Sequence, residues 1–314
     1  MQTLPEIVRQ LFDESKLAPG DLLQEAVKRY NAQPEVMIAA RDATQATDSP
    51  IVRIEDAAKI LASLGGKDRY PTGTPFDGVI GGGLRDGDLV VVSGPTANGK
   101  TTFAQTLSAH LAQTGVPSLW FSYEVAIPEL SSKFADMGAG VDQPLYCPLK
   151  HESGNLAWVK SKSLEASVLG IKVVVVDHLG FLLPEADASQ VRLDANYSVY
   201  LGSICRSLKS LAMSQQLVVV LMAHTRKTDE PRLHDIAHSG AIAQEADLVF
   251  MVNREIEPQP ELSGEIYTPY TRISLEKNRH TGKSVVCWFS LQQGRLAYAP
   301  AYHGLPRKSK SKTW

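Results

Sequence analysis

The sequence predicts an α/β fold with a mainly parallel sheet, preceded by a small helical region at the N-terminus. From about residue 70, β-branched apolar segments alternate with segments of helical spacing. Some strands, such as Val173 to Val176, are apolar at every position, which is typical of a parallel sheet buried on both faces. One apolar strand also runs directly into the glycine-rich sequence G-x-x-x-x-G-K-T, from Gly94 to Thr101, before a helical pattern begins.

The chain divides into four predicted parts. Residues 1–50 carry two short helical faces and a polar stretch, and they predict a small helical region. Residues 51–69 predict a linker helix that ends at Gly65 and Gly66. Residues 70–302 form the predicted α/β domain, and residues 303–314 form a basic tail. The tail is either a solvated chain end or a segment that touches nucleic acid.

Within the α/β domain, strands and helices follow from the periodicity of apolar residues. Strands are expected at 89–93, 118–123, 172–177, 217–222, 248–252 and 271–276, and helices at about 100–114, 127–138 and 194–214. The strands at 271–276 and 284–291 flank a turn containing glycine, which predicts a hairpin.

The glycine-rich loop predicts a site for nucleoside triphosphate. Backbone N–H groups of such a loop surround phosphate oxygens, and the following helix presents its positive end. Lys100 is expected to reach the β- and γ-phosphates, and the Thr101 hydroxyl to bind Mg²⁺. The alternative is an ordinary turn between a strand and a helix. The expected nucleotide-binding residues are Gly94, Pro95, Thr96, Ala97, Asn98, Gly99, Lys100, Thr101 and Thr102.

Polar residues end three of the predicted strands. Ligands of open α/β sheets bind at the carboxyl ends of the strands. Asp177 is therefore expected beside Mg²⁺, and Glu124 beside the γ-phosphate, where a carboxylate can orient the attacking water. His224 could sense the γ-phosphate from the third strand end. Capping or surface roles for the two acids, and a structural role for the histidine, are the competing interpretations.

Two basic segments are further candidates. The polar segment after His224 carries Arg226, Lys227 and Arg232, which could contact nucleic-acid phosphates or lie in a solvated loop. Lys277 and Arg279 lie at the turn of the last hairpin. An arginine presented across a subunit boundary could stabilise charge on a neighbouring subunit's ATP, and an ordinary basic turn is the alternative.

Composition limits the possible partners and compartments. The net charge of −2 gives no general attraction to nucleic acid, so contacts with it must be local. Three widely spaced cysteines, Cys147, Cys205 and Cys287, suggest neither a disulfide framework nor a zinc site and fit a reducing compartment. The N-terminal residues do not resemble a signal or transit peptide. The sequence lacks the run of about 18 apolar residues that a membrane span requires.

Six segments, in this order, resemble the RecA-like motor domain of DnaB-type ring helicases, with phage helicase-primases and Twinkle helicases the most similar. They are residues 71–89, the loop from Gly94 to Thr101, 121–124, 176–178, 239–247 and 277–279. The resemblance implies that Glu124 is the catalytic base, that His224 is the γ-phosphate sensor, and that Lys277 and Arg279 act in trans. It also places Leu291 where the family often has an aromatic residue against the nucleotide base.

The resemblance implies an ATP-dependent replicative DNA helicase. It would form a ring, expected to be a hexamer, and move 5′ to 3′ on single-stranded DNA with ATP and Mg²⁺. A primase or a loader would be a further partner, in the cytoplasm of a bacterium or of a phage-infected cell. A RecA- or RadA-type recombinase is one alternative. A KaiC-like regulatory ATPase that acts on protein partners is the other.

Overall fold

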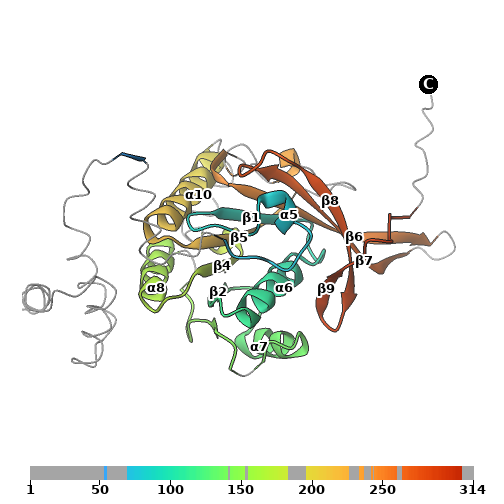
Figure 1. Cartoon of the computed structure of the whole chain (residues 1–314), viewed down its shortest axis with the longest axis horizontal. Helices are drawn as coiled ribbons and strands as arrows, with labels where there is room; N and C mark the ends of the chain where they lie inside the picture. Colours follow the sequence, from blue (N-terminus) through green and yellow to red (C-terminus); the bar gives the residue numbers. More distant parts are fainter. Residues whose placement is uncertain are drawn as a thin grey trace, which may run out of the picture.

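A single mixed sheet organises the described part of the chain (Figure 1). The structure is a computed structural model, and it describes residues 53–54, 69–140, 142–152, 155–182, 196–225, 233–236, 242, 244–259 and 264–305. The expected helical region at 1–50, nearly all of the expected linker helix and most of the basic tail lie outside these residues. Among the described residues, no helix has the length and apolar character to span a membrane.

The sheet has the strand order β3-β2-β4-β5-β1-β6-β7-β8-β9. The first six of these strands run parallel and the last three are antiparallel, which confirms the expected mainly parallel α/β sheet. The parallel strands are β1 (Leu89–Gly94), β2 (Ser118–Ser122), β3 (Leu145–Tyr146), β4 (Val173–Asp177), β5 (Val218–His224) and β6 (Leu248–Gln259). The antiparallel strands are β7 (Gly264–Asn278), β8 (Val285–Gln292) and β9 (Arg295–Tyr298).

Both faces of the parallel strands are covered, which explains their continuous apolar sequences. In β4, Val173 and Val175 belong to the core on one face of the sheet, and Val174 and Val176 to the core on the other. Side chains alternate between the two faces of a strand, so burial on both faces requires an apolar residue at every position.

Four long helices lie on the two sides of the sheet. Helices α6 (Lys100–Gln113) and α7 (Ile127–Asp136) cover one face, and α8 (Leu156–Val168) and α10 (Asn196–Gln215) cover the other (Figure 1). The sequence predicted α6, α7 and α10 but not α8. Helix α8 buries Val159, Ser163 and Ala166, so its inner face is partly polar and gives little apolar periodicity. Its N-cap, Asn155, which accepts a hydrogen bond from the Trp158 amide, was the available signal.

The antiparallel part of the sheet is longer than expected. The predicted hairpin of 271–276 with 284–291 is confirmed as β7 and β8. Strand β6, however, continues to Gln259 and pairs with β7 from Gly264, so the two form a long ribbon beyond the sheet (Figure 1). Alternation of polar and apolar residues in this ribbon hid its extent, because only the sheet-proximal residues are fully buried.

Candidate nucleotide site

The glycine-rich loop joins the carboxyl end of β1 to the N-terminus of α6, as the sequence predicted. Gly94 lies directly against β6: a Cβ atom at this position would be 2.1 Å from the Val252 carbonyl oxygen. Gly99 forms the N-cap of α6 with φ of 89°, a left-handed conformation that glycine adopts without strain. The loop amides and the positive end of α6 therefore meet at one place, which suits a phosphate group.

Lys100 is buried within the loop. Its ammonium donates hydrogen bonds to the carbonyl oxygens of Gly94 at 3.1 Å and Pro95 at 2.8 Å. Burial lowers the pKa of Lys100, and the nearby carboxylates of Glu124 and Asp177 oppose this shift. The loop thus holds a positive charge at the position where phosphate oxygens are expected.

Asp177 ends β4 beside the start of α6. Its Oδ2 accepts a hydrogen bond from the Thr101 hydroxyl at 2.8 Å, although the two residues lie on different elements. Asp177 is 1% exposed, and burial raises the pKa of its carboxyl to about 6, with Glu124 adding to the shift. A buried carboxylate next to a hydroxyl is an oxygen donor set that suits Mg²⁺, so these two residues fit the expected metal.

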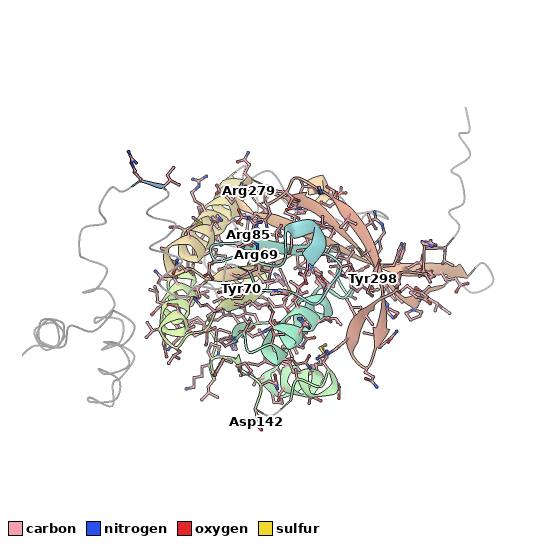
Figure 2. The ribbon with its side chains drawn as sticks, viewed as in Figure 1. Arg69, Tyr70, Arg85, Asp142, Arg279 and Tyr298 are labelled. Atoms are coloured by element: carbon pink, nitrogen blue, oxygen red, sulfur yellow. The ribbon has the colours of Figure 1, made fainter. Side chains whose placement is uncertain are left out.

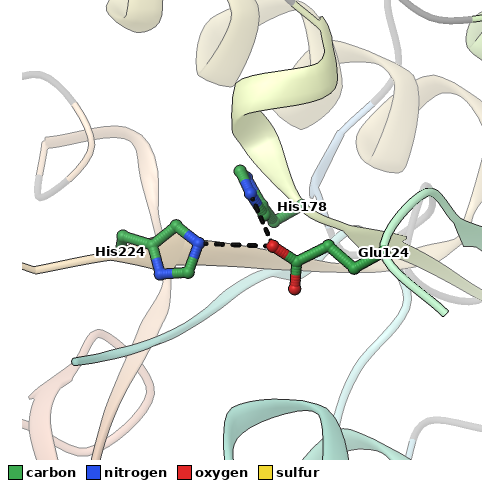
Figure 3. Close-up of side chains that lie close together, drawn as sticks. All are labelled: Glu124, His178 and His224. Atoms are coloured by element: carbon green, nitrogen blue, oxygen red, sulfur yellow. Dashed lines mark ion pairs between the residues drawn. The ribbon is translucent and has the colours of Figure 1, made fainter. Parts of the chain in front are cut away.

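Glu124 follows β2 and lies between two histidines (Figure 3). Its Oε1 is 2.9 Å from His178 Nε2 and 3.5 Å from His224 Nε2. The two imidazole rings are 4.3 Å apart in an edge-to-face arrangement. The other carboxylate oxygen of Glu124 points away from both rings (Figure 3).

The two histidines have lowered pKa values. Burial is the main cause for each, and the second histidine and Lys100 also disfavour the cationic form of His178, whose pKa falls to about 4. Both rings are therefore neutral near pH 7. Among the described residues, the buried Nδ1 of His224 has no hydrogen-bond partner, and such unpaired atoms are common where a ligand binds.

A cavity of about 290 Å³ joins these groups. On one side it is lined by the loop together with Glu124 and His224. On the other it is lined by β6, β7 and the β8–β9 turn, through Arg254, Pro269, Thr271, Leu291 and Leu296. Leu291 thus lies in the cavity, as expected, whereas Phe289 is buried in the core.

Lys277 and Arg279 lie at the opposite end of the parallel strands. The Arg279 amide donates to the Asp247 carbonyl, and the Asp247 amide donates to Leu89, the first residue of β1. From Leu89 to Gly94 the strand spans about 17 Å. Figure 2 shows Arg279 far from Tyr298 of β9, whose hairpin closes the cavity side of the domain.

The side chain of Arg279 is held within its own subunit. Nη1 forms an ion pair with Asp247 Oδ1 at 3.1 Å, and Nη2 donates to the Gln244 carbonyl oxygen at 2.6 Å. The side chain nevertheless remains 48% exposed. Burial and the adjacent Arg279 guanidinium lower the pKa of Lys277, which donates to the same Gln244 carbonyl at 3.3 Å.

The structure brings together most of the predicted site but not all of it. The loop, Glu124, Asp177 and His224 meet around one cavity, while Lys277 and Arg279 lie elsewhere. The expected DNA-binding residues Arg226, Lys227 and Arg232 lie outside the described residues.

Sequence reasoning assigned no role to two residues that belong to this site. His178 contacts Glu124, and Arg254 lines the cavity while its amide donates to Asn98 Oδ1 at 2.8 Å. The polar residue directly after Asp177 was a signal for the first. Nothing local marked Arg254, because it lies within a strand and reaches the loop only through the β1–β6 pairing.

A phosphate loop at a strand-to-helix turn, acidic residues at neighbouring strand ends and a mainly parallel sheet define the class of phosphate-loop NTPase domains with a RecA-like fold. Within this class, residues 151–295 match the family model of the DnaB-like helicase C terminal domain. The expected resemblance to DnaB-type helicase motor domains is thereby confirmed.

Curated relatives point the same way. The chain is 24% identical over 289 residues to a replicative DNA helicase DnaB from Pasteurella multocida, covering 80% of this chain and 61% of the relative. It is 25% identical over 267 residues to the DnaB of Leifsonia xyli subsp. xyli, covering 72% of this chain and 56% of that protein. The chain therefore spans little more than half the length of these relatives.

Solved structures support the fold. One of them, an isolated ATPase domain, matches with a TM-score of 0.63 and 17% identity, over 79% of this chain and 99% of that one. A DnaB-like replicative helicase, whose structure was reported with its interactions with primase, matches with a TM-score of 0.61 and 17% identity. That match covers 93% of this chain and 74% of the other. The RecA-like fold class is thus confirmed.

Proposed function

We propose that this protein is an ATP-dependent replicative DNA helicase that assembles into a ring, expected to be a hexamer, and translocates 5′ to 3′ on single-stranded DNA. The observation that carries the proposal is the separation of two sets of residues. The phosphate loop, Glu124 and His224 surround a cavity at the carboxyl ends of the strands. Lys277 and Arg279 lie at the amino ends, too far away to reach that cavity.

The residues around the cavity have distinct roles in ATP hydrolysis. The loop amides and Lys100 bind the phosphates and fix the γ-phosphate beside Glu124. The free oxygen of Glu124 orients a water molecule and accepts its proton, and His224 contacts the γ-phosphate. Thr101 and Asp177 would hold Mg²⁺, which when bound neutralises charge on the β- and γ-phosphate oxygens.

Arg279 and Lys277 complete the site of a neighbouring subunit. Because the two sets of residues lie at opposite ends of the sheet, subunits packed head to tail bring the hairpin tip of one to the cavity of the next. An arginine in this position stabilises the charge that develops on the transferred phosphoryl group. Hydrolysis then changes the contact between subunits, and this couples ATP turnover to movement.

Single-stranded DNA is the proposed track. Arg226, Lys227 and Arg232 follow the γ-phosphate sensor His224 in sequence, so a loop carrying them can respond to the state of the nucleotide. A primase or loader partner is a further proposal, which the match to a helicase studied with primase supports.

A mass measurement and an unwinding assay test this function. We expect a ring in the presence of ATP and Mg²⁺, and ATP-dependent unwinding of a fork with a free 5′ tail. A filament with strand-exchange activity would instead indicate the recombinase. ATPase activity without DNA affinity would indicate a regulatory ATPase. A monomer that hydrolyses ATP at full rate would contradict the subunit-shared site.

A further inference from the structure

His178 is a polar residue of the site that the mechanism above leaves without a role. It follows Asp177 at the end of β4, and the pairing of Ser122 with Asp177 brings it beside Glu124. Its Nε2 lies 2.9 Å from Glu124 Oε1, the shorter of the two histidine contacts made by this carboxylate. The ring also contacts Phe181, with centroids 5.1 Å apart.

The backbone fixes the tautomer of His178. The Gly180 amide donates a hydrogen bond to His178 Nδ1 at 2.8 Å, so this nitrogen is an acceptor and carries no proton. The proton of the neutral ring is therefore on Nε2, where it can be donated only toward Glu124 Oε1. The direction of the hydrogen bond to Glu124 follows from this geometry alone.

Gly180 also makes room for the ring. A Cβ atom at residue 180 would lie 2.5 Å from His178 Cε1 and 3.0 Å from Nδ1. Gly180 lies in the short 3-10 turn Leu179–Leu182, which packs against the core through Leu179 and Leu182. The turn therefore both orients the histidine and leaves space for it.

The same three side chains have the residue types of a metal site. One ligand atom each from Glu124, His178 and His224 lies within 4.8 Å of the others. Coordination through His178 Nε2 would, however, move its proton to Nδ1, where it would face the N–H of Gly180. Two donors would then oppose each other, so the backbone favours a hydrogen-bonding role over metal ligation.

We propose that His178 is the positioning residue for Glu124, holding Oε1 by a hydrogen bond so that the second oxygen faces the bound nucleotide. Glu124 needs such support because its side chain is 37% exposed and has several freely rotating bonds. Fixing the carboxylate before reaction removes an entropic cost from the barrier. This inference rests on the proposed ATPase function and names a residue that supports its catalytic base.

Steady-state ATPase kinetics of the full-length ring test the proposal. His178→Phe keeps a ring of similar size without the donor, and we expect kcat to fall about 10- to 100-fold, below the loss of roughly 10²–10⁴ for removing a general base. The KM for ATP should stay within about twofold, because His178 does not line the cavity. His178→Gln restores an N–H donor and should recover at least about fivefold of the lost kcat.

Two further variants separate positioning from a structural effect. In a Glu124→Gln background, His178→Phe should cause almost no additional loss, because the residue acts through the Glu124 carboxylate. Gly180→Ala should reproduce the loss by displacing the ring, whereas Gly78→Ala, whose added Cβ meets no atom within 4 Å, serves as the matched control.

The outcomes can be distinguished from failure of the proposed function. A wild-type protein without ATPase activity would contradict the function itself. An active wild type together with an unchanged kcat in His178→Phe would overturn the positioning role, as would an equal loss in the two backgrounds. If His178→Phe does not fold, Gly180→Ala decides: kcat equal to that of Gly78→Ala overturns the proposal.

Discussion

Replacing Arg279 by alanine separates catalysis in trans from a structural role. The substitution removes one ion pair to Asp247 and one hydrogen bond to Gln244 from a side chain that is 48% exposed. A half-exposed pair of this kind contributes about 0–1 kcal/mol to stability. An arginine finger, by contrast, contributes roughly 10³–10⁵ in rate, or about 4–7 kcal/mol of transition-state stabilisation. The expected effect on turnover therefore exceeds the expected effect on folding several times over.

The assay combines ATPase rate, nucleotide binding and thermal unfolding. We expect Arg279→Ala to lose at least about 10³-fold in kcat while its Tm and ATP affinity stay close to wild type. Arg206→Ala is the matched control, because Arg206 forms a single ion pair of 3.1 Å with Glu245 and is 74% exposed. Retention of full ATPase activity by Arg279→Ala, in rings shown to be assembled, would refute the reasoning.

Mixing experiments test the shared site directly. Lys100→Ala should also abolish turnover, because it removes the charge within the phosphate loop. Each inactive protein still carries the half of the site that the other has lost. A mixture can therefore form intact seams between subunits, about a quarter of all seams for random assortment into a ring. ATPase activity regained on mixing would have no source within a single chain. Added to wild type, Arg279→Ala should poison the mixed rings.

Three further outcomes are expected. Gly94→Ala should lower Tm by several degrees, or about 1–3 kcal/mol, because its Cβ would be 2.1 Å from the Val252 carbonyl; a Tm equal to wild type would contradict the close approach. The pKa of Asp177 is about 6 when folded and 3.8 in its model form, so the folded state binds this proton more tightly. Without Mg²⁺, the wild type should therefore lose about 3 kcal/mol of stability relative to Asp177→Asn as pH rises from about 4 to 6, and parallel pH profiles in chemical denaturation would exclude this. Alanine at the three loop cations should weaken single-strand binding and reduce the slope of log K against log salt by up to about 0.7 each; an unchanged slope would remove these residues from the interface. These cations are Arg226, Lys227 and Arg232.

The sequence alone determined the elements and the chemistry carried by strand ends. Continuous apolar segments such as Val173 to Val176 could mean only strands buried on both faces, and both cores do cover β4. The loop from Gly94 to Thr101 and the acids Glu124 and Asp177 were recognisable because residue type and local spacing specify them. Helix α8 escaped because a helix with a partly polar inner face gives no strong period.

Only the tertiary structure decided which of these residues meet. His178 contacts Glu124 because β2 pairs with β4, and Arg254 reaches the loop because β6 pairs with β1. Arg279 lies remote from the cavity for a similar reason: antiparallel β7 returns to the amino ends of the parallel strands. Strand order and direction arise from long-range packing of the whole sheet, and local periodicity carries no record of which strand becomes the neighbour. Residue identity thus fixed the available chemistry, and the sheet fixed which groups act within one subunit and which face its neighbour.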